Sequence, residues 1–462
     1  MDIQVPIIRG DRINSFSDYE DALPINMIAV SRDIQGASGY LYSHDGLSQI
    51  RTGEGPDRGA LYNERMQRSF RVSGRKLIEI TATGTVVLGD IPGSGQATIA
   101  YSFNSIMVVA DGSAYRYDGS VFTQITDPDI GSPLSVTWID GYYFFTDGEY
   151  IYHTDINDES SIDPLKFATS EISPDPTKAV SRTQDDLVVV FNRYSTEYFI
   201  NQANEQFAFT RLNQKAVNAG IVGTHAWTEM DGNLYILGGR KEERVSVHLL
   251  ATGQTIAIAT RYIDSIISSY SETDLVNAKL ECRIADRDQL LYVHLPNDTL
   301  VFNQSIAKKL GQDSAWSRLE SNENAWRAVN MIFDPSLNLW VCGDRLDSKI
   351  GKLDHSKASQ YGDSVDSVFY TPFIPIESAS VDQIELKTVS GFTAEDTSLF
   401  LSTTRDGAQY SQEWSKEVSV VQNYEHRYIP RRLGYVRLIV GFKFRAHHKE
   451  KICVSGLVVS YG

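Results

Sequence analysis

The sequence predicts an all-β protein, in which a β-propeller of about seven four-stranded blades precedes a C-terminal β-sandwich. Three observations support this fold class. The chain has 462 residues, more than one simple core usually contains. Gly outnumbers Pro by 33 to 14 and Asp-Gly steps recur, which indicates many tight turns. Short aromatic and β-branched runs return at a similar spacing along most of the chain, which is typical of a repetitive architecture.

The repeating unit is clearest between residues 135 and 171. Three runs, 135–139, 142–146 and 149–153, are separated by Asp140-Gly141 and Asp147-Gly148. Asp-Gly tolerates positive φ and therefore suits the two-residue turns that join antiparallel strands. A fourth run, 166–171, follows an acidic loop. We expect these runs to form one four-stranded meander.

Seven such units follow one another, starting near residues 60, 97, 135, 179, 224, 279 and 328. A four-stranded sheet of this size cannot bury both of its faces alone. Stacking several such sheets around an axis buries them against one another, which favours a propeller. Meanders in unrelated sandwiches are the alternative, since the repeats carry neither a Trp-Asp nor a kelch signature.

The seventh unit shows only three strands, so its fourth strand must come from elsewhere in the chain. Residues 47–52 are the natural donor, because ring closure by the other end of the chain removes an exposed sheet edge. We therefore expect an N-terminal arm or cap at 1–40, a propeller at 41–365 with 47–52 as the closing strand of the last blade, and a sandwich at 366–462. The last part holds seven or eight strand-like runs, enough for a separate β-sandwich.

A short helical insertion is expected near 262–278, between two blades. Ile263, Ile266, Ile267 and Tyr270 follow the i, i+3, i+4, i+7 spacing of one helix face. Ser271 or Thr273 is suited to cap a second short turn.

The net charge of −16 disfavours direct binding to nucleic acid, because affinity for phosphates comes largely from Lys and Arg. The segment from Glu425 to Lys451 is an exception, with eight basic residues. It contains Arg427, Arg431, Arg432, Arg437, Lys443, Arg445, Lys449 and Lys451. Partial alternation is expected to place Arg437, Lys443 and Arg445 on exposed positions of one strand. The functional interpretation is a docking surface for an acidic neighbour, and the alternative is a solvated sheet face.

Several classes of protein are disfavoured by the sequence. The apolar runs are far shorter than the roughly 20 residues that span a bilayer, and the N-terminus lacks the features of a signal peptide. Cys282, Cys342 and Cys453 form no CxxC pair, so neither a disulfide framework nor a zinc site is expected.

No catalytic or cofactor motif is found, and we expect no enzyme activity and no cofactor. The stretch 403–414 has Asp406 next to Gly407, whereas a sialidase-type box resembles Ser-x-Asp-x-Gly-x-x-Trp. His447 and His448 are adjacent, so on a strand they point to opposite faces and cannot easily share one metal ion. The His44-Asp45 pair and His355 have no recognisable nucleophile as a partner.

Stretches spread along nearly the whole chain resemble, in order, the tail hub proteins of short-tailed phages, also called packaged-DNA-stabilisation or tail accessory proteins. They include LPINMIAV (23–30), ASGYLYSHDGL (37–47), RGALYN (58–63), STEYF (195–199), QKAVNAGIVGT (214–224), IATRYIDSIISSYSETDL (258–275), VCGDRLDSKIGKLD (341–354) and RRLGYVRLIVGFKFR (431–445). Their shared order, and not any single string, makes the resemblance specific.

This resemblance implies a structural virion protein of the tail, assembled in the host cytoplasm. Six copies would form a ring below the portal-adaptor ring, extend the DNA exit channel, help retain packaged DNA, and contact the tail needle and tailspike proteins. DNA would pass without specific binding, and no membrane is involved. No family binding residue maps to a motif here.

Two other functions are kept open. One is a propeller glycan hydrolase or lectin that acts at the host cell surface. The other is an arginine-mediated DNA clamp that uses residues 427–451, which would require steep salt dependence of duplex binding.

Overall fold

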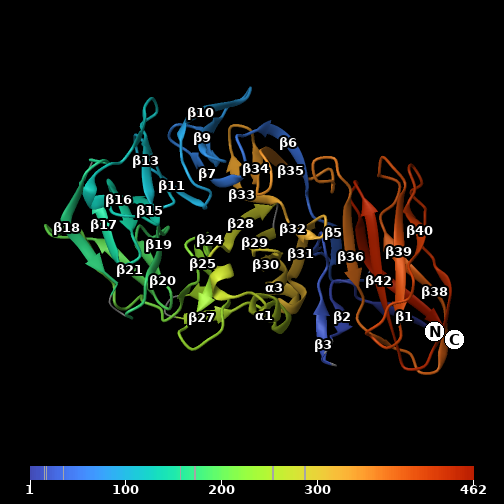
Figure 1. The fold of residues 1–462 in the computed structure, drawn as a ribbon. Helices are drawn as coiled ribbons and strands as arrows, with labels where there is room; N and C mark the ends of the chain where they lie inside the picture. The colour runs from blue at the N-terminus through green and yellow to red at the C-terminus, as the bar shows by residue number, and fades with distance from the viewer. Residues whose placement is uncertain are drawn as a thin grey trace.

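The computed structural model describes residues 1–14, 16, 18–34, 36–156, 158–170, 173–251, 254–285 and 288–462. The molecule is elongated, with a ring of small sheets at one end and two packed sheets at the other (Figure 1). The predicted propeller, sandwich and helical insertion are confirmed.

Seven small antiparallel sheets form the ring. Blade 1 consists of β7 (Asp57–Asn63), β8 (Arg68–Ser73), β9 (Lys76–Ile80) and β10 (Thr85–Asp90), and blade 2 of β11 (Ala97–Tyr101), β12 (Ile106–Ala110), β13 (Ser113–Tyr117) and β14 (Phe122–Gln124). Blade 3 consists of β15 (Ser135–Ile139), β16 (Tyr142–Thr146), β17 (Tyr150–Thr154) and β18 (Ile162–Thr169), and blade 4 of β19 (Thr177–Arg182), β20 (Val188–Asn192), β21 (Thr196–Asn201) and β22 (Phe209–Arg211). Blade 5 consists of β23 (Gly220–Ile221), β24 (Trp227–Met230), β25 (Asn233–Gly239), β26 (Ser246–Ala251) and β27 (Gln254–Ala257). Blade 6 consists of β28 (Lys279–Ala285), β29 (Asp288–His294), β30 (Thr299–Asn303), β31 (Trp316–Ser321) and β32 (Asn324–Ala325). Blade 7 consists of β33 (Ala328–Asp334), β34 (Leu339–Asp344), β35 (Lys349–Asp354) and β6 (Gly46–Thr52).

The Asp-Gly steps act as turns, although not all in the same way. At Asp140-Gly141 both residues have positive φ, and Ile139 pairs directly with Tyr142, as in a two-residue hairpin. At Asp147-Gly148 only the glycine has positive φ, and the next strand begins at Tyr150, so this turn is longer. The fourth strand, expected at 166–171, instead spans Ile162–Thr169; Glu171 lies outside the described residues.

The ring closes between blades 7 and 1. Strand β6 pairs antiparallel with β35, with Leu47 opposite Leu353. Behind this seam, the buried Arg71 of β8 donates to Asp57 at 2.7 Å and to the carbonyl oxygen of Asn330 in β33, also at 2.7 Å. Since Asn330 in turn donates to Asp57 at 2.6 Å, a buried polar network joins the first and last blades.

The helices interrupt the ring beside blades 5 and 6. α1 (Arg261–Ser268) is capped by Thr260, and its Ile263 and Ile267 are buried, in line with the predicted face. α2 (Glu272–Leu275) is capped by Ser271 in a reciprocal capping box with Asp274. α3 (Gln304–Leu310), which sequence reasoning missed, starts at the cap Asn303. The longest helix of the described chain has eight residues, too short to cross a bilayer.

The sandwich combines the C-terminal strands with N-terminal ones. One sheet has the order β4 (Met27–Val30), β5 (Tyr40–Ser43), β43 (Cys453–Tyr461), β38 (Ala379–Thr388) and β41 (Arg431–Val436), with β1 (Asp2–Val5) also paired to β43. The other has the order β36 (Val365–Tyr370), β42 (Ile439–His448), β39 (Thr397–Thr404) and β40 (Trp414–Ser419), with β37 (Ile374–Pro375) paired to β42; β2 (Gly10–Ile13) and β3 (Tyr19–Ala22) form a separate hairpin.

The N-terminal segment thus differs from the arm or cap expected at 1–40. β1 and β4 are strands of the sandwich, and their apolar residues Val5, Met27 and Ala29 are buried in its core. This core is continuous with that of blades 4 to 6, since Phe191 and Leu237 of the ring belong to the same apolar cluster as Val454 and Leu457. The two parts of the molecule therefore share buried surface.

Candidate docking surfaces

Three of the basic residues singled out in the sequence lie at the outer edge of the sandwich. Arg431 and Arg432 are exposed on β41, the last strand of its sheet, and Arg437 is exposed in the turn that leads to β42. Among the described residues, none of the three forms an ion pair with a carboxylate. Tyr435 and Leu438 beside them are 55% and 65% exposed. This edge is therefore both cationic and partly apolar.

Three more of the eight, Arg427, Lys443 and Arg445, lie elsewhere and are not available in the same way. Arg427 makes a bidentate pair with Glu385, at 2.8 and 2.6 Å. Arg445 on β42 pairs with Glu413 at 2.6 Å, and its guanidinium also lies 3.4 Å from Asp366. Lys443 lines, with Arg445, a cavity of about 230 Å³ that also includes Glu320 and Glu323 of the propeller.

The expectation that Arg437, Lys443 and Arg445 share one strand is wrong. The chain turns at Arg437-Leu438, because β41 belongs to one sheet of the sandwich and β42 to the other. The apolar pattern alone predicts one continuous strand here, because Val436, Ile439 and Val440 on both sides of the turn are hydrophobic. The structure consequently separates these basic residues and does not align them on one strand.

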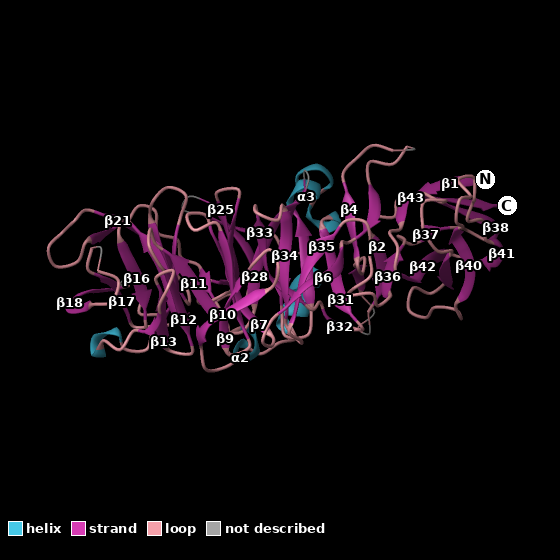
Figure 2. Cartoon of the chain, turned by 90° about the horizontal axis from the view of Figure 1, so that it is seen from above, coloured by secondary structure: helices cyan, strands magenta, loops and turns pink. Residues whose placement is uncertain are grey.

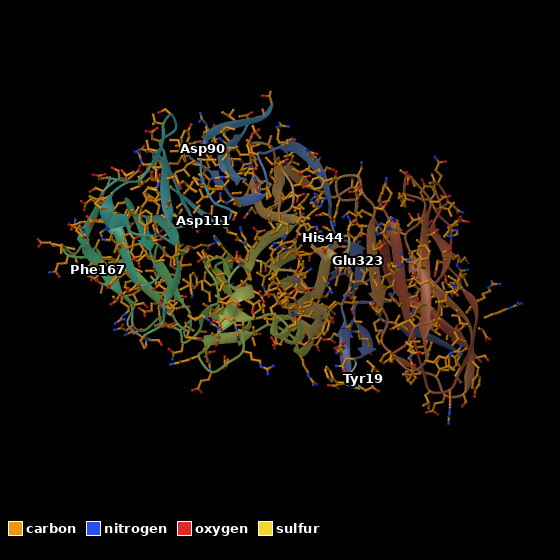
Figure 3. All side chains as sticks on the ribbon, in the orientation of Figure 1. Tyr19, His44, Asp90, Asp111, Phe167 and Glu323 are labelled. Atoms are coloured by element: carbon orange, nitrogen blue, oxygen red, sulfur yellow. The ribbon has the colours of Figure 1, made fainter. Side chains whose placement is uncertain are left out.

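An ionic cluster around Asp45, largely buried except for His355, connects the propeller to the sandwich. One carboxylate oxygen of Asp45 is 2.9 Å from Lys451, which precedes β43, and the other is 2.6 Å from Arg283 of β28 and 3.0 Å from His355. Burial disfavours the charged form of Asp45, yet the hydrogen bond from His355 and the two cations hold the pKa of Asp45 below its usual range. His44, next to Asp45, and Glu323 both lie between the two parts in Figure 3.

A second link is made by backbone. Ile25 donates to the carbonyl of Val368 in β36 at 2.8 Å, and Asn26 donates to that of Arg318 in β31, also at 2.8 Å. The side chain of Asn26 donates to the carbonyl of Asp366 at 2.8 Å. The segment before β4 therefore bridges blade 6 and the sandwich. Hydrogen bonds, ion pairs and a shared apolar core hold the two parts together.

The middle of the ring contains an aromatic cavity of about 350 Å³, lined by residues of β7, β11, β15, β19 and β24. Phe103 lies beneath the guanidinium of Arg65 at 3.8 Å and meets Trp138 edge-on at 4.8 Å. Within the described part of the chain, its lining includes no Asp or Glu. It can stack a planar group, but it lacks the facing carboxylates of glycoside hydrolysis.

The other chemical candidates are occupied by structural contacts. Asp406 accepts hydrogen bonds from the backbone of Ala408 and Gln409, which lower its pKa and close its own turn. His448 is buried against Ser367, whereas His447 is exposed beside Asp366, so the two rings face opposite sides. The three cysteines are free, and the described residues contain no group of three or more side chains suited to a metal ion.

Sequence comparison covers both parts of the molecule. A family model described as the β-propeller of bacteriophage P22 Gp10 matches residues 3–358, and one described as its β-sandwich matches residues 366–462. The chain is also 30% identical to the tail hub protein gp10 of Salmonella phage P22 over 474 aligned positions, covering 98% of each chain. The chain belongs to the P22 Gp10 family of tail hub proteins.

Solved structures similar to this tail hub family member include other propellers. Virginiamycin B lyase from Staphylococcus aureus is 13% identical, with a TM-score of 0.42, covering 68% of this chain and 98% of the lyase. The Pan2 WD40 domain of Neurospora crassa is 7% identical, with a TM-score of 0.41, covering 68% of this chain and 95% of that domain. We draw no functional conclusion from similarities of this size.

In this tail hub protein, sequence reasoning missed the cluster around Asp45. From sequence alone, His44, Asp45 and His355 suggest only a catalytic group that lacks a nucleophile. The signal that could have found their role is the position of Asp45 directly before the closing strand, at the point where the chain leaves the sandwich sheet and enters the ring.

Proposed function

We propose that this protein is the structural hub of a phage tail, located in the virion and assembled in the host cytoplasm. The observation that carries the proposal is the match to a tail hub protein across the whole chain, propeller and sandwich together. A match confined to the propeller would carry far less weight, since propellers host many unrelated functions.

In its finer form the proposal follows the resemblance seen in the sequence. About six copies form a ring below the portal-adaptor ring, extend the DNA exit channel, help retain packaged DNA, and support the needle and tailspikes. A tail hub that connects the adaptor ring to the needle and tailspikes must be rigid. The propeller and the sandwich suit this role because a common core and the Asp45 cluster join them.

DNA passes through the assembled channel without specific binding. Residues 366–462 hold eleven acidic and eleven basic residues, so the whole net charge of −16 resides in residues 1–365. An acidic propeller repels the phosphate backbone, which favours sliding over adhesion.

The protein acts through its surfaces and not through catalysis. Two findings support this: the central cavity lacks facing carboxylates in its described lining, and Asp406 caps its own turn. No observation favours the alternative of a glycan hydrolase or lectin.

The test is assembly on a purified portal-adaptor complex. The full-length protein is mixed with the complex of its own phage, and the mixture is separated on a density gradient. We expect the protein to comigrate with the complex at about six copies per ring. A protein that stays at the top of the gradient while the complex is intact would overturn the proposal.

A further inference from the structure

The two ends of the molecule carry complementary surfaces. Viewed from above, β18 of blade 3 lies at one extreme of the long axis and β41 of the sandwich at the other (Figure 2). Each is the last strand of its sheet, so each presents a free strand edge. Free edges are places where proteins associate unless they are covered or charged.

The blade 3 end is acidic. From Asp127 to Thr169 the sequence carries nine acidic residues and a single basic one, Lys166. Lys166 is already paired, since Asp155 and Asp163 both contact its ammonium group. Asp129 and Glu149 are exposed, and neither has a cationic partner among the described residues.

The same end exposes apolar side chains. Leu165 and Phe167 on β18 are 80% and 48% exposed, and the ring of Phe167 rests edge-on against Tyr150 at 5.1 Å. Figure 3 labels Phe167 at this extreme of the molecule. Large apolar side chains grouped at an exposed edge are typical of an interaction site.

The β41 end carries a cluster of exposed arginines beside exposed apolar side chains. Arg405, Arg431, Arg432 and Arg437 are exposed there, and none forms an ion pair with a described carboxylate. Arg405 is held by a hydrogen bond to the carbonyl of Leu433 at 3.1 Å. Tyr435 and Leu438 supply the apolar component.

We propose that the β18 end of one copy docks on the β41 end of the next, so that copies of this chain associate head to tail. The acidic, apolar β18 end and the arginine-bearing, apolar β41 end thus offer complementary charge and apolar surface in a single contact. Because two different surfaces meet, the contact is heterologous, and repeating it through a closing rotation generates a ring. The inference rests on the proposed function for its use of a ring, but its contact is tested separately.

The first experiment reverses charge on each end. One variant carries Arg431→Glu with Arg437→Glu, and the other carries Asp129→Lys with Glu149→Lys. We expect each alone to weaken self-association by about tenfold or more, measured by sedimentation velocity at low salt. An equimolar mixture should regain association, because every contact in an alternating ring then pairs opposite charges.

The matched control is Arg240→Glu with Lys241→Glu, which reverses two exposed cations on blade 5. It should associate like the unchanged protein. If the control weakens association equally, or if the mixture of the two variants fails to recover association that each variant lost, the head-to-tail contact is wrong.

The second experiment tests the contact in assembled tails, so it also applies if the free protein is monomeric. Leu165→Cys and Leu438→Cys are combined in one chain, and tails purified from virions are treated with a short bismaleimide. We expect a ladder of covalent multimers, absent from each single variant and from the pair Val86→Cys with Leu438→Cys. Val86 is a half-exposed residue on β10 of another blade.

The outcomes separate the two proposals. Tails that contain the double variant but give no ladder overturn the contact and leave the tail hub role intact. Virions that lack even the unchanged protein overturn the tail hub role, and the mixing experiment then decides the contact alone.

Discussion

At the scale of single residues, a few buried polar groups connect elements that are distant in the chain. Asp45 pairs with Arg283 of blade 6 and Lys451 just before β43, and accepts a hydrogen bond from His355 in the segment after the ring. Arg283 is almost completely buried, so it depends on Asp45 for compensation of its charge. Loss of the Asp45 carboxylate would therefore leave the buried Arg283 without its partner at the junction of propeller and sandwich.

Asp45→Asn should reduce the free energy of unfolding by about 3 kcal/mol, because breaking a buried ion pair strands the remaining charge. Urea unfolding followed by tryptophan fluorescence measures this. The control Asp33→Asn removes an exposed carboxylate 3.8 Å from Lys309 and should cost at most about 0.5 kcal/mol. Equal losses for the two variants would contradict a special role for Asp45.

The buried His44 predicts that the free energy of unfolding depends on pH. Its ring is buried, donates from Nδ1 to the carbonyl of Asp45 at 3.0 Å, and accepts at Nε2 from the hydroxyl of Tyr292 at 3.0 Å. Burial lowers the pKa of His44 to about 3, below the value of about 6.5 in an unfolded chain. The unfolded state therefore binds more protons below pH 6.5, and the free energy of unfolding falls as the pH decreases from about 6.5 towards 3.

His44→Gln should flatten this dependence by up to about 1.4 kcal/mol per pH unit, the contribution of one such group. The measurement is the slope of unfolding free energy against pH between about 6.5 and 5, compared with the unchanged protein. Parallel curves would show that His44 is not the titrating group, whatever the absolute stability of the variant.

At the scale of elements, the strand that closes the ring is the least local part of the propeller. β6 pairs with β35 across about three hundred residues, and its Leu47 is packed in a cluster with Leu290, Trp326 and Leu353. Without this strand, blade 7 would expose the edge of β35.

Leu47→Ala should lower the free energy of unfolding by about 3 kcal/mol, since it opens a cavity in a fully buried position. Gln49→Ala on the same strand is the control, because Gln49 is exposed and its replacement should cost no more than about 0.5 kcal/mol. Guanidinium unfolding of both variants provides the comparison. The role assigned to the closing strand would be wrong if Leu47→Ala were as mild as its control.

At the scale of the whole molecule, charge is unevenly distributed. Residues 366–462 are formally neutral, whereas residues 1–365 carry the net charge of −16. The exposed arginines of the β41 end therefore belong to a molecule whose net charge repels the phosphate backbone of DNA. This distribution favours contact with an acidic protein surface over contact with duplex DNA.

We expect no binding to a short DNA duplex at physiological salt, and no steep dependence on salt concentration below it, in a fluorescence anisotropy titration. Arg431→Glu with Arg437→Glu should leave this result unchanged. A steep loss of affinity with added salt, removed by the same two substitutions, would instead support the arginine clamp on DNA.

The sequence by itself determined the local structure. Hydrophobic spacing and Asp-Gly steps encode short strands and their reversals, and the apolar face from Ile263 to Tyr270 encodes a helix, because these patterns act over a few residues. α3 was missed because its seven residues, Gln304–Leu310, lie in a short gap between two strand-like runs. Turn and strand boundaries moved for a similar reason, as at Tyr150 and Ile162.

Only the tertiary structure decided which distant segments meet. The pairing of β1 and β5 with β43, the separation of Arg437 from Lys443 by a change of sheet, and the convergence of three side chains on Asp45 depend on how whole sheets pack. Local pattern fixes which face of a strand is apolar, but the free energy that selects its neighbour comes from burying that face in one particular arrangement.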